Sequence, residues 1–175
     1  MKKTFYIFVL AVLFAACTND KKTANTSQSA PSVETSLQSK LQETEPLTSA
    51  ALKAAFPQQL YDLKLDKEPV IINQTISGHF GGRKITLAIT DAAGENYRNA
   101  TYFLNTLNDN SFENTADTKY IKKERNGIPT FAKQYVGSHT ELEFLYKNRF
   151  YISLLSEMPP DELWDAFDLK SLNNL

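Results

Sequence analysis

The sequence contains few of the residues that build cross-links, metal sites or nucleophile–base pairs. Its single cysteine, Cys17, cannot form a disulfide within one chain. His79 and His139 are the only histidines, and zinc usually needs three or four ligands, so we expect neither a metal nor a cofactor. No serine lies in a Gly-X-Ser-X-Gly motif, which argues against the nucleophile elbow of serine hydrolases. These shortages favour a non-enzymatic protein whose fold depends on its hydrophobic core.

An excess of charge of either sign is also missing. Lysine and arginine number 19 against 20 aspartates and glutamates, for a net charge of −1. Such a balance gives no electrostatic reason to expect a nucleic-acid partner. One basic run, Lys119, Lys122, Lys123 and Arg125, alternates with Tyr120 and Ile121. Lysines in such a strand most often protect a sheet edge from pairing with another chain, and a weak anion contact is the alternative.

The amino terminus has the layout of a secretory signal. Lys2 and Lys3 precede an apolar run over residues 5–14, which is too short to span a bilayer. The next residues, Phe14-Ala15-Ala16-Cys17, resemble the lipobox of bacterial lipoproteins, although leucine is usual where Phe14 stands. The resemblance implies cleavage after residue 16, diacylation of the Cys17 sulfur and acylation of the new amino terminus. The alternative is a plain secretory signal with an incidental cysteine.

This resemblance also implies an address in the cell envelope. Two or three acyl chains make a stable membrane anchor, whereas one chain binds reversibly. Thr18, rather than aspartate, follows the cysteine, which by resemblance to enterobacterial sorting indicates the outer membrane if the cell has one. Lys21 and Lys22 leave no acidic cluster of the kind that sends lipoproteins to the cell surface. We therefore expect a periplasm-facing protein that is anchored to the membrane at Cys17.

Residues 17–46 are predicted to form the lipidated cysteine and a flexible tether. From Thr18 to Pro46 the chain has no aromatic residue and no glycine, and it is rich in polar side chains. Too little apolar surface is available there to offset the entropy cost of ordering the backbone. Leu37 and Leu41 lie four residues apart and favour no more than a transient helix over 36–45. The tether is expected to make no stable contact with the domain.

Residues 47–175 are predicted to form one domain, whose first half contains two helices and two strands. The alanine-rich residues 47–56 favour a helix capped by Thr48 or Ser49. Alternation over 70–80 predicts a strand with Val70, Ile72, Ile76 and Phe80 on one side. Gly81-Gly82 then predicts a tight turn into a second strand over 83–91. A helical period returns over residues 96–107.

The second half of the domain is predicted to be a meander followed by a helix. Its turns are marked by Asn126-Gly127, Gly137-Ser138 and Lys147-Asn148-Arg149. A two-residue loop at the third turn would place the carboxylate of Glu143 on the apolar face, at a cost of several kcal/mol. A three-residue loop instead pairs Phe144 with Ile152, and we expect this register. The residues after Asp161 favour a helix with Trp164 on its buried side.

This order of elements predicts an α+β fold with an antiparallel sheet of about five to six strands. The helices that begin near Asn96 and Asp161 are expected to cover one face of the sheet. The element order loosely resembles the Mog1/PsbP-like architecture, without a signature motif.

The meander also carries apolar residues on the face opposite Phe144, namely Leu145, Tyr151 and Leu155. A solvated sheet face should be more polar, so either the helix at 47–56 covers these residues or they form an interaction surface. We therefore expect a non-enzymatic protein-binding or assembly domain in the cell envelope. A carrier or sensor of a small apolar or lipid ligand is the alternative. A cleft that joined His79 or His139 to carboxylates would instead favour a hydrolase.

Overall fold

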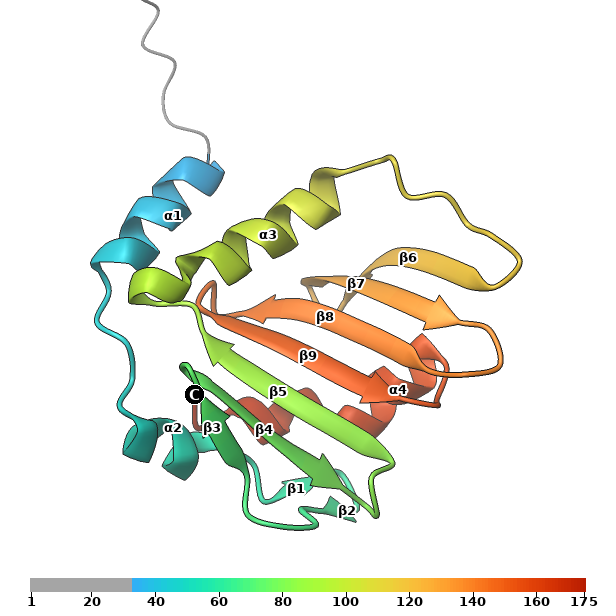
Figure 1. The fold of residues 1–175 in the computed structure, drawn as a ribbon, viewed down its shortest axis with the longest axis horizontal. Helices are drawn as coiled ribbons and strands as arrows, with labels where there is room; N and C mark the ends of the chain where they lie inside the picture. Colours follow the sequence, from blue (N-terminus) through green and yellow to red (C-terminus); the bar gives the residue numbers. More distant parts are fainter. Residues whose placement is uncertain (1–32) are drawn as a thin grey trace, which may run out of the picture. The chain divides into compact units, whose positions relative to one another are not determined.

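The computed structural model describes residues 33–175, so the predicted signal peptide, Cys17 and the tether up to residue 32 lie outside the described residues. The fold is α+β, as predicted, and is built on a seven-stranded antiparallel sheet in the order β3-β4-β5-β9-β8-β7-β6 (Figure 1). Its strands are β3 (Val70–Ile72), β4 (Thr75–Phe80), β5 (Ile85–Asp91), β6 (Thr118–Arg125), β7 (Ile128–Tyr135), β8 (Thr140–Tyr146) and β9 (Phe150–Ser156). The sheet is thus larger than the five to six strands expected.

The additional strand arises because the predicted strand over 70–80 folds back on itself. Asn73 and Gln74 both have positive φ angles, 47° and 63°, which are typical of a two-residue hairpin turn. Ile71 therefore pairs with Ile76, and the prediction that Val70 and Ile72 share a side with Ile76 is wrong. Val70 and Ile72 lie on the opposite face of the sheet, where both are exposed.

The pairing of β8 with β9 confirms the three-residue loop. Phe144 pairs with Ile152 and Leu142 pairs with Leu154, so these apolar side chains share one face. We call this the back face, and the face of Tyr151, Ser153 and Leu155 the front face. All four of the paired back-face side chains are fully buried, which agrees with the cost of placing a carboxylate there.

Aromatic and aliphatic side chains from several elements cover the back face. The helix α4 (Pro160–Phe167) places Trp164 edge-on to Phe144, with ring centroids 5.2 Å apart. The helix α2 (Ser49–Ala55) is capped by the Thr48 hydroxyl, which accepts from the Ala51 N–H. Phe56 follows α2 and packs on Phe80 of β4. The back face is completed by the hairpin of β1 (Gln59–Leu60) and β2 (Leu63–Lys64) and by the 3-10 helix η2 (Leu169–Leu172).

The helix α3 (Tyr97–Asn108), which follows the short 3-10 helix η1 (Gly94–Asn96), lies on the other side of the sheet. Its Phe103 packs on Tyr151, with ring centroids 6.2 Å apart, whereas α4 lies behind the strands (Figure 1). The prediction that the helices from Asn96 and Asp161 cover one face is therefore wrong, because they cover opposite faces. The front apolar residues are also not covered by the helix at 47–56, since α2 packs on the back.

The structure also corrects the predicted tether from Val33 onward. Residues Val33–Glu43 form the helix α1, which packs on α3 and η1 (Figure 1). Leu41 of α1 is only 3% exposed, so this part of the chain makes stable contacts that the prediction excluded. The segment after α1 is held by Arg149, whose guanidinium donates to the Glu45 carbonyl and to the Asp91 carboxylate.

Candidate functional site

The structure separates the three residues of the predicted interaction surface. Leu145 is buried, with 9% of its surface exposed, and Tyr151 is half-buried against Phe103 of α3. Leu155, which lies further along β9, is 40% exposed. The three residues share the front face as predicted, but α3 covers one end of it and leaves the other end open.

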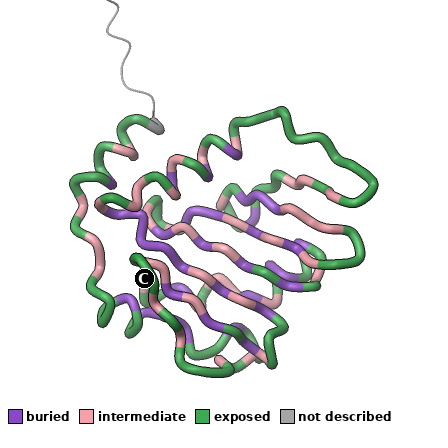
Figure 2. The backbone as a smooth tube through the Cα atoms, in the orientation of Figure 1, coloured by how far each residue is buried: buried purple, intermediate pink, exposed green. Residues whose placement is uncertain are grey.

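The open part of the front face consists of two cross-strand rows. One row joins Ser77, Ala88, Ser153 and Glu143, all of which are half-buried. Small side chains in its centre make a shallow surface beside α3. These half-buried positions alternate with buried back-face residues along the same strands in Figure 2.

The next row joins His79, Thr86, Leu155 and Glu141. At the β3 edge of the same face, Val70 and Ile72 are 58% and 66% exposed. Three exposed apolar side chains, Leu155, Val70 and Ile72, thus interrupt a face whose other open positions are mostly polar.

Glu143 marks the boundary between the covered and the open part of this face. Burial raises the pKa of its carboxyl above the ordinary value, and the hydrogen bond from Tyr151 counteracts part of that rise. The pKa of Tyr151 is raised as well, first by burial and then by the negative charge of Glu143. Glu143 is thus a carboxylate whose charge is poorly solvated, and it ends the row that contains Ser77, Ala88 and Ser153.

The two histidines lie at the far end of the front face. The Nδ1 of His79 lies 2.8 Å from the Thr86 hydroxyl, within a cross-strand pair. The Nδ1 of His139 lies 2.9 Å from the Ser138 hydroxyl, and its Nε2 lies 3.7 Å from Glu141. This series of serine, histidine and glutamate has the residue types of a hydrolytic triad.

Its environment differs from that of a triad. The side chains of His139 and Glu141 are 37% and 39% exposed at a hairpin end, so water screens their interaction. Glu157 lines the same open hollow as His139. Preorganised catalytic dipoles act in sites from which water is excluded, so this arrangement does not favour the hydrolase hypothesis.

The basic run predicted from the sequence lies on β6, which is an edge strand as expected. Three of its side chains bind groups of the chain itself. Arg125 is buried and donates to Asp161 at 2.7 Å, and Lys123 bonds the same carboxylate. Lys122 donates to the Leu107 carbonyl at 2.9 Å. These contacts connect the edge to α3 and α4, which leaves little of the run for an anion.

A hollow on the back face was not anticipated from the sequence. It is lined by Asn126, Tyr146, Trp164, Asp165 and Asn173, among others, and has a volume of about 380 Å³. These residues come from a turn, a strand, a helix and the segment around η2. No local pattern could have identified the hollow, because its residues are brought together only by the fold.

Within residues 33–175, no group of three or more histidine, cysteine or acidic side chains is arranged to hold a metal ion. None of the helices in that range is long and apolar enough to cross a membrane. No protein-family model, curated protein or solved structure matches this chain. The likeness to the Mog1/PsbP-like architecture stays a prediction.

Proposed function

We propose that this chain is a membrane-anchored lipoprotein of the bacterial cell envelope whose domain binds a protein partner without catalysing a reaction. The lipobox at Phe14-Ala15-Ala16-Cys17 supports the anchor. The open part of the front face supports the binding role, and it is the observation that carries the proposal.

A protein partner suits this face because the face is wide and shallow. The rows of Ser77 and His79 run across four strands, from β4 to β8, without a helix over them. Leu155, Val70 and Ile72 offer apolar contacts at separated points. A partner that lay across the strands would bury all three, whereas a small ligand would contact only one.

The filled interior argues against the alternative, a carrier of a small apolar ligand. Phe80, Phe103, Phe144 and Phe167 are each fully buried, or nearly so, between the sheet and its helices. An apolar ligand needs an enclosed apolar cavity of its own size. The hollows beside Trp164, Met158 and His139 are open to solvent and have polar groups in their walls.

The anchor is tested with Cys17→Ser, because only a thiol can accept the diacylglycerol thioether. Cells are labelled with a fatty-acid analogue and fractionated. We expect wild type to carry label in the membrane fraction and the variant to lose it. Equal labelling of both, or a soluble unlabelled wild type, would contradict the lipoprotein assignment.

The binding role is tested by photo-crosslinking in living cells. Leu155 is replaced by p-benzoylphenylalanine, and the matched control places the same residue at Tyr61, which is 69% exposed on the turn between β1 and β2. We expect one protein adduct from position 155, repeated from position 70 and absent from position 61. Adducts of equal yield at all three positions, or none at 155 and 70, would refute a front-face interface.

A further inference from the structure

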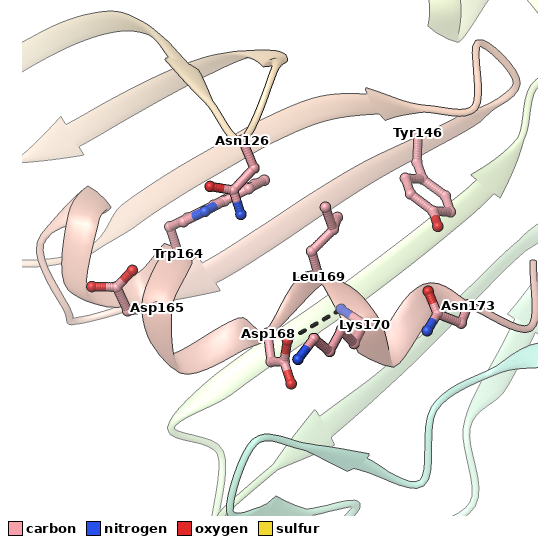
Figure 3. A pocket seen from close by; sticks show the side chains of 8 residues that line it. All are labelled: Asn126, Tyr146, Trp164, Asp165, Asp168, Leu169, Lys170 and Asn173. Carbon is pink, nitrogen blue, oxygen red and sulfur yellow. Dashed lines mark hydrogen bonds between the residues drawn. The ribbon is translucent and has the colours of Figure 1, made fainter.

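The hollow on the back face has an aromatic and aliphatic floor with a polar rim (Figure 3). Tyr146 at the end of β8 and Leu169 of η2 supply the accessible apolar surface, and the largely buried Trp164 of α4 lies below them. Asn126, in the turn between β6 and β7, lies beside the indole of Trp164 in this view. Its volume of about 380 Å³ lies in the range of small-molecule sites, roughly 300–1,000 Å³.

Four polar groups of the rim make no hydrogen bond within the described part of the fold. Within residues 33–175, the only buried side-chain nitrogen or oxygen atom without a hydrogen-bond partner is the Ser171 hydroxyl. The indole N–H of Trp164, which has no protein acceptor in that range, is therefore open to solvent although the side chain is only 7% exposed. The Tyr146 hydroxyl and the side-chain amides of Asn126 and Asn173 also make no hydrogen bond to another of the described residues.

The walls that hold these groups are well defined. Asp168 joins α4 to η2 with a φ of 50°, a conformation that a residue other than glycine adopts at a cost. Its carboxylate accepts from the Lys170 N–H at 3.2 Å, and this bond, drawn in Figure 3, begins η2. Asn126 occupies the left-handed position of an Asn-Gly turn. The rim is thus set by local backbone geometry together with the hydrogen bond between Asp168 and Lys170.

The chemistry of the rim selects among ligand classes. Phosphate needs several cationic donors, but Lys170 is the only cationic residue in the lining and two aspartates lie beside it. An amine ligand would leave the Trp164 N–H and the Lys170 ammonium without acceptors, because an ammonium group only donates. Hydroxyl groups both donate and accept, so they match amides, a carboxylate and an indole N–H at once.

We propose that this hollow binds a neutral sugar ring. The ring's C–H face packs on the half-buried side chains of Tyr146 and Leu169. Its hydroxyls bond Asn126, Asp165 and Asn173, and one of them accepts from the indole N–H of Trp164. The site lies on the opposite face of the sheet from Leu155, so it is independent of the proposed protein interface. Either proposal can fail without the other.

Trp164 is the only tryptophan in the chain, so it reports directly on the hollow. The full chain, held in a detergent without a sugar headgroup, is titrated with cellobiose and with chitobiose while tryptophan emission is recorded. Spermidine and inorganic phosphate serve as probes of the competing chemistries. We expect a saturable change in emission with at least one disaccharide and no such change with spermidine or phosphate.

The variants Asn173→Ala and Asp165→Asn remove rim groups from exposed side chains, so the core stays intact. Each should weaken sugar binding about tenfold, as the loss of one or two ligand hydrogen bonds does. The control Asn110→Ala, in an exposed loop, should bind within about twofold of wild type. Unchanged affinity in both rim variants would overturn the proposal. So would a response to spermidine or phosphate alone, or no response to either sugar from a folded chain.

Discussion

The contact between Asp91 and Arg149 offers the sharpest test of how the domain is held together. The Asp91 carboxylate is completely buried and accepts from Arg149 Nε at 2.7 Å. It also accepts from the backbone N–H groups of Leu47 and Ala93, at 2.7 and 3.2 Å. One side chain therefore joins the end of β5, the β8–β9 turn and the start of the domain.

Arg149→Met keeps the length of the side chain and removes its charge. Leaving a buried carboxylate without its ion partner costs about 3–5 kcal/mol. Because the two backbone donors remain and Arg149 is itself 25% exposed, we expect the lower end, about 3 kcal/mol. The measurement is urea unfolding at pH 7, followed by far-UV circular dichroism with a check that the m-value is unchanged. Arg98→Met, at an exposed arginine on α3, is the matched control and should change stability by less than about 0.5 kcal/mol.

The pH dependence of the same pair gives a second arm. Burial raises the pKa of Asp91, but hydrogen bonds from Arg149 and the two backbone groups outweigh it and hold the pKa below the ordinary 3.8. The stabilisation is therefore complete above the unfolded pKa and is lost as the pH falls through the lower folded pKa. The difference between wild type and Arg149→Met should shrink below about pH 4. In an Asp91→Asn background, Arg149→Met should cost less than about 1 kcal/mol. If Arg149→Met in the wild-type background costs less than about 1 kcal/mol, the contact between Asp91 and Arg149 does not hold the domain together.

Three further outcomes are expected. Phe144→Ala should lower the free energy of unfolding by about 3–5 kcal/mol in urea titrations, since the ring is fully buried, and a cost below about 1 kcal/mol would contradict the packing of the back face. A chain that starts at Pro46 should melt about 5 °C below one that starts at Pro31, because the shorter chain lacks the buried Leu41. Equal melting temperatures would show that the segment before Pro46 does not stabilise the domain. The pKa of Glu143 is raised in the folded state, so the stability of the domain falls as the pH rises above the ordinary 4.5. Glu143→Gln should therefore raise the melting temperature at pH 7 and leave it unchanged at pH 3.5. A lower melting temperature of the variant at pH 7 would show that the fold satisfies the charge of Glu143.

Local patterns in the sequence were sufficient for most of the strands and turns. The Asn126-Gly127 turn and the three-residue loop before Phe150 follow from backbone preferences and from the cost of burying Glu143, both of which act between near neighbours. The Asn73-Gln74 turn was missed because neither residue is glycine, although both adopt positive φ. That single turn reverses the side on which Val70 and Ile72 lie.

The placement of the helices and of both candidate sites depended on tertiary structure. An amphipathic period shows that α3 and α4 each bury one side, but it does not say on which face of the sheet. Leu37 and Leu41 stabilise α1 by packing against α3. The sequence of the segment alone does not show this contact, so it predicted a flexible tether. The anchor proposed at Cys17 rests on consecutive residues alone, since a lipobox is a linear motif. The front face and the hollow at Trp164 could not, because residues far apart in the chain meet there only after the sheet has formed.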